Sequence, residues 1–376
     1  MDITPFRIDI SQAELDELRQ RLVNTRWPAE YPGAEWSRGV PVVYLRGLVD
    51  HWLTKFDWRA QEAALNEFPQ FTTEIDGQRV HFLHVRSERP DAVPMVLTHG
   101  WPGSVAEFTK VIGPLVDAGF HLVVPALPGF GFSGPVSELG WNHKRVAAAW
   151  ASLMAGLGYE RYVAQGGDLG AAVTRELGVI DADHVMAIHV NGGLSFPMIE
   201  GEPPADLTDL ERARLARMAE FMAGPGYYLQ LHTARPQTVA YALTDSPVGQ
   251  LAWIVERFKE WTDLSRDLPE DAVDVDQLLT NVCIYWFTRT AGSSAGMYAE
   301  DAAVWGAPQP STVPAAVAQF TVQDIAIRRY DEVDNNVVRW TDFDRGGHFA
   351  AMEAPDLLVK DVVEFFSSDF NSLRHP

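Results

Sequence analysis

The clearest indication of a fold lies in Arg161–Leu177, RYVAQGGDLGAAVTREL. An apolar run ends in two glycines, and a helix-forming run begins directly after Asp168. This strand, turn and helix match the pattern Gly-x-nucleophile-x-Gly, in which close glycines allow a sharp bend that exposes the central side chain. The central residue is usually serine, and here it is an aspartate. We therefore ask why a carboxylate stands where an exposed nucleophile is normal.

Two roles for Asp168 are open from its position alone. Aspartate is common as the N-cap of a helix, and the following helix begins at residue 169. The same carboxylate can act as a nucleophile and form an ester that must later be hydrolysed. The N-terminus of the helix favours the negative charge in both cases. The three neighbouring glycines favour the nucleophile, because a simple cap does not require them.

Similar apolar runs elsewhere predict a parallel sheet. Buried strands are expected in the runs 93–100, 120–129, 161–167 and 185–193, with helices between them at 104–118, 143–157 and 169–180. Strands that alternate with helices indicate βαβ units. Before them, Asp76-Gly77 joins two alternating runs and predicts a β-hairpin with a type I′ turn. Strand patterns return at 316–324 and 336–344, and a last helix is expected at 355–367.

The pattern between these strands predicts the domain organisation. Residues 195–306 are mostly helical and aromatic, which we interpret as a helical cap inserted into the α/β core. The core then consists of residues 71–194 and 307–376. Residues 1–70 begin with an amphipathic helix capped by Ser11, and the following Pro- and Trp-rich stretch has little strand pattern. We expect this N-terminal segment to wrap the core and the cap, with the cap above the C-terminal strand ends where such sheets carry their sites.

Composition excludes several classes of function. The 376 residues carry a net charge of −21, with 30 Lys and Arg against 51 Asp and Glu. Such a chain is unsuited to nucleic acid or anionic lipid. Cys283 is the only cysteine, so there is no intrachain disulfide and a reducing compartment is expected. The N-terminus lacks signal-peptide features, and no apolar run approaches the roughly 20 residues of a membrane span. We predict a cytoplasmic protein with no membrane partner.

A histidine late in the chain is the candidate base. His348 lies in RGGHFAAMEAPDLL, after the glycine pair 346–347 and before the last helix. Sites built on this kind of turn follow the chain order nucleophile, acid, base. Although most isolated loop histidines are simply solvated, this position favours a role in activating water.

The acid that orients His348 is expected after the preceding strand. Asp324 directly follows the pattern FTVQD and is preferred. Asp331 and Glu332 lie close by in sequence and remain alternatives.

Two loops near the expected strand ends also bear on the site. THGWPGS, residues 98–104, follows a strand, and its position predicts that the amides of Trp101 and Leu169 form an oxyanion hole. GFGFSG, residues 129–134, has the spacing of a dinucleotide-binding loop, but Pro135 blocks the immediate entry into a helix. We interpret it as a loop that shapes a pocket. No nicotinamide, other organic cofactor or metal is implied.

Taken together, HGWP, GGDLG and RGGHFAAMEAPDLL resemble the epoxide hydrolases of the α/β-hydrolase superfamily. PFRIDISQAELDELRQRLVNTRWP is similar to the extra N-terminal segment of their microsomal-type branch. YALTDSPVGQLAWIVERFKEWTD and LLTNVCIYWFTRTAGSS resemble cap segments of that branch. The resemblance covers nearly the whole chain. The membrane anchor of the microsomal enzymes is missing, which is typical of a soluble bacterial member.

The resemblance implies an α/β-hydrolase fold and a mechanism in which an aspartate opens the epoxide. The ester carbonyl gives water a point of attack that the ether of a serine would lack. By match to the family, Asp168 is the nucleophile, His348 the base and Asp324 the acid, although FTVQD departs from the Phe-Pro that often precedes this acid. Tyr298 and a second cap tyrosine donate hydrogen bonds to the epoxide oxygen. We choose Tyr228 for the second position, with its neighbour Tyr227 as the alternative.

Other functions remain to be weighed. A haloalkane dehalogenase also uses an aspartate in this turn, commonly followed by tryptophan where this chain has Leu169. A catalytically idle ligand-binding protein of the same fold is a second alternative. A pocket lined by aromatic side chains would suit a bulky hydrophobic epoxide. The candidate lining residues are Trp101, Phe108, Phe130, Phe132, Trp286 and Phe349. Core packing explains these aromatic residues equally well. Detoxification, secondary metabolism and a homo-oligomeric state are all open.

Overall fold

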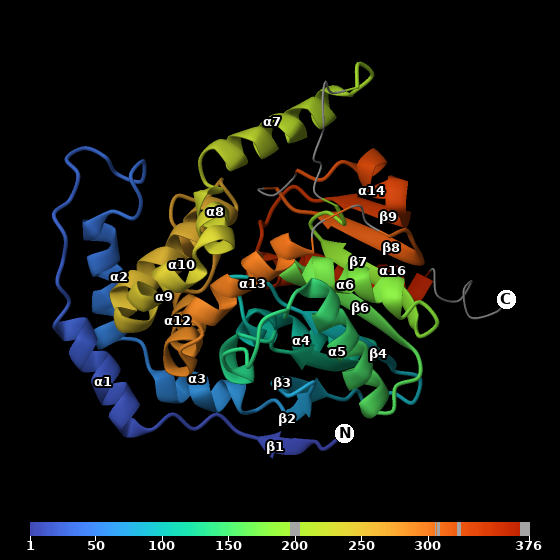
Figure 1. Ribbon diagram of the computed structural model, residues 1–376, viewed down its shortest axis with the longest axis horizontal. Helices are drawn as coiled ribbons and strands as arrows, with labels where there is room; N and C mark the ends of the chain where they lie inside the picture. The colour runs from blue at the N-terminus through green and yellow to red at the C-terminus, as the bar shows by residue number, and fades with distance from the viewer. Residues whose placement is uncertain (196–203, 305, 307–308, 322–324, 369–376) are drawn as a thin grey trace.

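A twisted sheet with helices on both faces forms the core of the protein (Figure 1). The computed structural model describes residues 1–195, 204–304, 306, 309–321 and 325–368. Within them, one sheet has the strand order β1-β2-β3-β5-β4-β6-β7-β8-β9. The strands are β1 (Thr4–Phe6), β2 (Gln70–Ile75), β3 (Gln78–Val85), β4 (Val93–Thr98), β5 (Phe120–Pro125), β6 (Tyr162–Gly167), β7 (Val185–Asn191), β8 (Ser311–Gln319) and β9 (Asn335–Asp342).

In the order in which the strands lie across the sheet, β1, β2, β3 and β5 pair antiparallel. From β5 onward, β5, β4, β6, β7, β8 and β9 pair parallel. The predicted hairpin is confirmed, since β2 and β3 pair around Asp76 and Gly77, whose φ angles are 51° and 73°. Positive φ at both central residues is the geometry of a type I′ turn.

Helices cover both faces of the sheet because its central strands are apolar on both sides. In β4, Met95 packs in one apolar cluster with α4 (Thr109–Ala118) and α16 (Pro355–Ser368). The next residue, Val96, packs in the other cluster with α5 (His143–Gly156) and α6 (Leu169–Ile180). These helices, together with the short η1 (Val105–Phe108), confirm the predicted helical segments. The α/β architecture expected from the sequence is therefore correct.

The N-terminal segment contains two helices that the sequence pattern did not reveal. After α1 (Gln12–Val23), whose N-cap is Ser11 as expected, come α2 (Val42–Thr54) and α3 (Trp58–Leu65). The composition of α2 does not predict a helix, because valines and a glycine, which have low helix propensity, interrupt its good helix formers. Its buried residues Leu45, Leu48, Val49 and Trp52 nevertheless have helical spacing.

Between β7 and β8 the chain leaves the sheet and forms a mainly helical region (Figure 1). Its helices are α7 (Asp209–Ala223), α8 (Tyr227–Ala234), α9 (Pro236–Asp245), α10 (Pro247–Trp261), α11 (Pro269–Ala272), α12 (Val275–Thr288) and α13 (Ala291–Ala303). The N-terminal segment packs against this cap, since His51 Nε2 lies 2.7 Å from Asp276 Oδ1 and Tyr44 donates to Glu270 Oε2 at 2.7 Å. No helix of the described residues has the length and apolar character needed to cross a bilayer.

Candidate active site

Asp168 occupies a sharp turn between β6 and α6. Its φ of 54° and ψ of −128° lie in a region that a residue with a side chain rarely adopts. The side chain makes no capping hydrogen bond to α6. Instead, Oδ1 accepts a hydrogen bond of 2.8 Å from the backbone N–H of Trp101. The interpretation of Asp168 as a simple helix cap is therefore wrong.

Close backbone contacts explain the glycines around this turn. A Cβ on Gly170 would lie 2.0 Å from the carbonyl oxygen of Thr98, and one on Gly166 would lie 2.3 Å from that of Gly170. A Cβ on Gly100 would lie 2.3 Å from Asp168 Cβ. Real Cβ atoms do not approach other atoms this closely. The glycines are thus what allows strand, helix and carboxylate to meet.

The two amides predicted to form an oxyanion hole belong to Trp101 and Leu169. Trp101 N–H already contacts Oδ1. Leu169 is the first residue of α6, where backbone N–H groups have no intrahelical acceptor. In the described part of the chain, this amide makes no hydrogen bond to Asp168. The assignment of the Leu169 amide to an oxyanion hole stays a prediction.

A cap helix holds the loop that carries Trp101. Asn281 Nδ2, on α12, donates to the carbonyl oxygen of Pro102 at 2.6 Å. Tyr285 Oη, one turn further on, donates to that of Gly103 at 2.7 Å. The position of the Trp101 amide thus depends on the cap as well as on β4.

His348 faces the other oxygen of the same carboxylate. Its Nε2 lies 3.6 Å from Asp168 Oδ2, and its side chain is 7% exposed. Burial lowers the pKa of His348, whereas the negative charge of Asp168 raises it, and the net shift is downward. A neutral imidazole at neutral pH is the form that can accept a proton from water.

The loop of His348 is bound to the end of α10. The His348 N–H donates to the carbonyl oxygen of Trp261 at 2.8 Å, and the two rings lie 4.9 Å apart. Glu353, in α15 (Ala350–Glu353), accepts hydrogen bonds from the backbone N–H groups of Phe349 and Asp263 at 3.0 and 2.8 Å. These contacts fix the imidazole relative to the cap.

Among the acid candidates, Asp324 lies outside the described residues. Asp331, in α14 (Arg328–Asp334), is buried, and its carboxylate accepts hydrogen bonds from the amides of Leu194 and Ser195 and from the Ser195 hydroxyl, at 3.1, 3.0 and 2.5 Å. These contacts give Asp331 a structural role in the loop after β7. Glu332 instead pairs with Arg328 at 2.7 Å on the surface. The assignment of Asp324 stays a prediction.

Two buried tyrosines lie together above Trp101. Tyr228 on α8 stacks on Trp101 with ring centroids 5.1 Å apart, and Tyr298 on α13 meets Tyr228 edge-on at 5.8 Å. Burial and then the charge of Asp168 raise the pKa of both phenols, so both are protonated donors at neutral pH. Tyr227 is 41% exposed, and its hydroxyl donates to Glu256. Of the two neighbouring tyrosines, Tyr228 is the one that lies beside Trp101.

Two titratable residues at this site were missed by the sequence analysis. His232 is fully buried between Trp101 and both tyrosines, with Nε2 accepting a hydrogen bond of 3.1 Å from Trp253. Burial lowers its pKa to about 3. Its position four residues after Tyr228, on the same helix face, was the available signal. For Glu107 on η1, burial and the charge of Asp168 raise the pKa to about 8.

The remaining aromatic candidates divide between the site and ordinary packing. Phe349 follows His348 and stacks on Phe258 at 4.0 Å. Phe132 packs against Phe6 of β1, and Trp286 lies under Arg21 of α1 at 5.7 Å. Core packing and contacts with the N-terminal segment account for these last two.

The loop GFGFSG binds a cap helix. Ser293 on α13 donates to the carbonyl oxygen of Gly129 at 2.6 Å, and the Gly131 amide donates to Thr290 at 3.1 Å. The loop thus holds α13, the helix that carries Tyr298, against the core.

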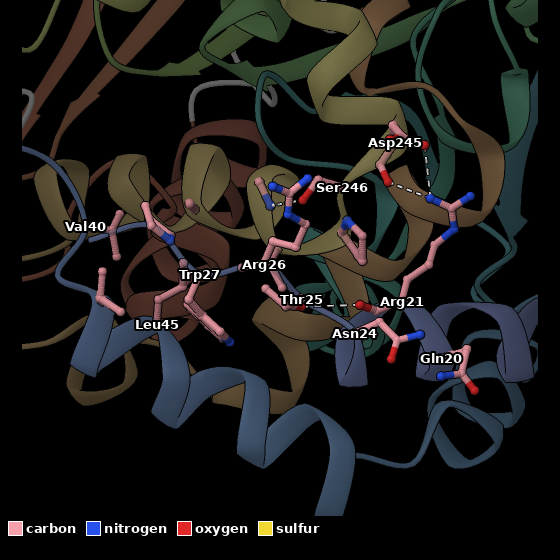
Figure 2. Close-up of a pocket in the computed structure, with 16 residues that line it drawn as sticks. Gln20, Arg21, Asn24, Thr25, Arg26, Trp27, Val40, Leu45, Asp245 and Ser246 are labelled. Atoms are coloured by element: carbon pink, nitrogen blue, oxygen red, sulfur yellow. Dashed lines mark hydrogen bonds and ion pairs between the residues drawn. The ribbon is translucent and has the colours of Figure 1, made fainter. Parts of the chain in front are cut away.

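A cavity of about 600 Å³ lies apart from the candidate site (Figure 2). It lies between the loop that follows α1 and the start of α10, and its lining includes Arg21, Trp27, Val40 and Asp245. Asp168 and its neighbours do not contribute to it. The chemistry described here does not belong to this cavity.

Comparison with known proteins agrees with this geometry. Residues 3–108 match the family model described as epoxide hydrolase N terminus, and residues 93–238 match the alpha/beta hydrolase fold. A Stigmatella aurantiaca protein named "Putative epoxide hydrolase" is 46% identical over 97% of this chain and 84% of that protein. Epoxide hydrolase 1 of Oryctolagus cuniculus is 30% identical over 96% of this chain and 88% of its own length.

Solved structures give the same result. The Aspergillus niger epoxide hydrolase superposes with a TM-score of 0.86 and 33% identity over 98% of this chain and 97% of the other. The juvenile hormone epoxide hydrolase of Bombyx mori superposes with a TM-score of 0.88 and 28% identity, over 100% and 96%. The fold and family expected from the sequence motifs are confirmed. The chain belongs to the epoxide hydrolases of the α/β-hydrolase fold, in the branch that carries the epoxide hydrolase N-terminal region.

Proposed function

We propose that this epoxide hydrolase converts its substrate to a vicinal diol through a covalent ester on Asp168. One observation carries the proposal: the two oxygens of the Asp168 carboxylate have different partners. Oδ1 is held by the Trp101 amide, and Oδ2 faces His348. A carboxylate arranged in this way has one oxygen prepared to carry charge and one directed toward the reacting groups.

In the first step, Asp168 Oδ2 attacks an epoxide carbon and the carbon–oxygen bond of the ring breaks. The hydroxyls of Tyr228 and Tyr298 donate hydrogen bonds to the departing oxygen, and one of them transfers its proton to the alkoxide. The product is a hydroxyalkyl ester of Asp168. Solvent then returns the proton to the phenolate, which a raised pKa favours.

In the second step, His348 takes a proton from water, and the hydroxide attacks the ester carbonyl carbon. Charge develops on Oδ1, where the amides of Trp101 and Leu169 stabilise it. The tetrahedral intermediate then collapses, and the imidazolium returns its proton to the departing diol oxygen. The Asp168 carboxylic acid that remains releases its proton to solvent, which restores the free carboxylate. Asp324 is the residue proposed to orient His348.

The substrate class follows from the surroundings of Asp168. Trp101, Trp261 and the two tyrosines pack ring against ring, and the amide of Trp101 holds the carboxylate. We therefore propose a bulky hydrophobic epoxide. No organic cofactor enters this mechanism, and a metal plays no part in its steps.

The experiment is a single turnover in H₂¹⁸O with the enzyme in excess over styrene oxide. The mechanism requires one ¹⁸O in the Asp168 carboxylate and an unlabelled diol after the first turnover. Direct attack of water on the epoxide would place ¹⁸O in the diol and leave the protein unlabelled. Asp168→Ala is the control, and its retention of turnover would remove the covalent mechanism.

A further inference from the structure

Arg257 on α10 is a buried cation behind the candidate site. Its side chain is 1% exposed, which is unusual for arginine. Nη2 lies 2.7 Å from Glu256 Oε2, and Nη1 lies 2.7 Å from Glu260 Oε2. Nη1 also donates to the carbonyl oxygen of Pro225 at 2.9 Å. The burial is therefore compensated by pairing, as a buried charge requires.

The partners of Arg257 are more exposed than the cation itself. The side chains of Glu256 and Glu260 are 14% and 26% exposed, and both border a surface cavity of about 600 Å³ that Tyr227 also lines. Solvent weakens the negative field of these carboxylates more than that of a fully buried charge. The guanidinium is thus the most buried member of this charge cluster, and its carboxylates lie nearer to solvent.

The guanidinium contacts two neighbouring tyrosines: Nη2 donates to the hydroxyl of the exposed Tyr227 at 3.2 Å, and Cζ lies over the ring of the buried Tyr228. Arg257 Cζ lies 5.2 Å from the centroid of the Tyr228 ring and 5.7 Å from that of Trp261. Both distances are within the range of a cation–π contact. Tyr228 in turn stacks on Trp101, and Trp261 packs against the imidazole of His348. A single aromatic ring thus separates Arg257 from Trp101 on one side and from His348 on the other.

We propose that Arg257 is a positioning residue that holds Tyr228 in place and strengthens its hydroxyl as a donor to the departing epoxide oxygen. This inference rests on the proposed function. Negative charge shifts toward the phenol as the ring opens, and a fixed cation in a low-dielectric site stabilises that charge. Burial, then Asp168, raises the pKa of Tyr228; its interaction with Tyr298 and then the charge of Arg257 lower it, and Glu260 raises it.

A purely structural role for Arg257 makes a different prediction. If the guanidinium only fills space and pairs with glutamates, its loss harms the enzyme whether or not residue 228 carries a hydroxyl. If it acts through that hydroxyl, its loss matters only where the hydroxyl is present. A double-mutant cycle between Arg257 and Tyr228 separates the two cases.

The experiment measures ester formation and ester hydrolysis separately, by rapid mixing of excess enzyme with styrene oxide. Arg257→Met and Arg257→Lys are each made in the wild-type and Tyr228→Phe backgrounds. Arg212→Met is the matched control, because Arg212 is a 54% exposed arginine of the cap that pairs only with Asp209 among the described contacts.

Arg257→Met should slow ester formation about tenfold in the wild-type background and less than about twofold in Tyr228→Phe. Arg257→Lys keeps the charge and should recover the rate to within about threefold of wild type. Ester hydrolysis should change less than about twofold throughout, because the phenol takes no part in that step.

The inference is overturned if Arg257→Met slows ester formation equally in both backgrounds, or slows hydrolysis as much as ester formation. If the methionine variant does not fold, the lysine variant gives the same test, since its smaller loss must also vanish in Tyr228→Phe. Complete absence of an ester on Asp168 in the wild-type enzyme would instead overturn the proposed function.

Discussion

Tyr298→Phe should slow catalysis while stabilising the fold. The Tyr298 side chain is buried, and its hydroxyl, which interacts with the Tyr228 phenol, makes no hydrogen bond of normal geometry in the described part of the structure. An unpaired buried hydroxyl opposes folding, because it loses its bonds to water. We propose that the epoxide oxygen is the partner for which this hydroxyl is held. Removing the hydroxyl should slow ester formation and raise the free energy of unfolding.

The two effects have different magnitudes. Leaving a buried polar group unpaired costs about 1–3 kcal/mol, so its removal should raise the free energy of unfolding by about 1 kcal/mol. For a chain of this size that corresponds to a rise in Tm of about 1 °C. Loss of one donor to a developing alkoxide, with Tyr228 still present, should slow ester formation about 100-fold.

Tyr285→Phe is the matched comparison. Tyr285 is also buried, but its hydroxyl donates to the Gly103 carbonyl oxygen at 2.7 Å. Its removal leaves that carbonyl unpaired and should lower the free energy of unfolding by about 1–2 kcal/mol. Thermal unfolding and rapid-mixing measurements of ester formation on both variants complete the assay.

Opposite signs in the Tm shifts are the result that supports the reasoning. Equal destabilisation of the two variants would show that the Tyr298 hydroxyl has a partner in the folded protein. Unchanged ester formation in Tyr298→Phe would refute its role as a donor to the epoxide oxygen.

Three further predictions test the turn, the acid and the base. Gly170→Ala should destabilise the protein by more than about 3 kcal/mol, because its Cβ would lie 2.0 Å from a carbonyl oxygen. Gly113 lies in a helix with open space around it, so Gly113→Ala should be neutral or stabilising in thermal unfolding. Similar Tm values for both would argue against the tight turn. Asp324→Ala should slow ester hydrolysis strongly, whereas Asp331→Ala should mainly lower stability through its lost loop contacts, and the reverse ranking in single-turnover rates would move the acid. Burial lowers the pKa of His348 from 6.5, and ester formation removes the opposing negative charge of Asp168. The rate of ester hydrolysis should therefore decline with falling pH only below 6.5. A single-turnover midpoint above that value would contradict the assignment of His348 as the base.

The core could be predicted from the sequence because its signals are local. The alternation of apolar runs and helices fixed the order of the central elements, and the glycines around Asp168 marked the turn. Why glycine is needed at these positions is visible only in three dimensions, where Gly170 packs against the strand end at Thr98. Sequence alone left the cap role of Asp168 open, because the decisive contact is with Trp101, 67 residues away.

The cap and the N-terminal segment were harder to predict. Their helices have mixed composition and are stabilised by contacts with distant elements, such as that of His51 with Asp276. Tyr227 and Tyr228 are adjacent in sequence, so only the direction of α8 distinguishes the exposed phenol from the buried one. Arg257 gave no sequence signal, because one arginine in an amphipathic helix is normally solvated.

The most direct test of the covalent mechanism uses His348→Gln, which removes the base but leaves the Asp168 carboxylate and its amide partner. The variant is incubated separately with aryl epoxides, alkyl epoxides and haloalkanes, and intact protein mass is recorded before peptide mapping. Our account predicts a mass gain equal to one whole epoxide, located on the peptide that contains Asp168, with no release of diol. A gain of an alkyl group from haloalkanes alone, or no adduct with any epoxide while the wild-type enzyme turns it over, would contradict the proposed ester intermediate.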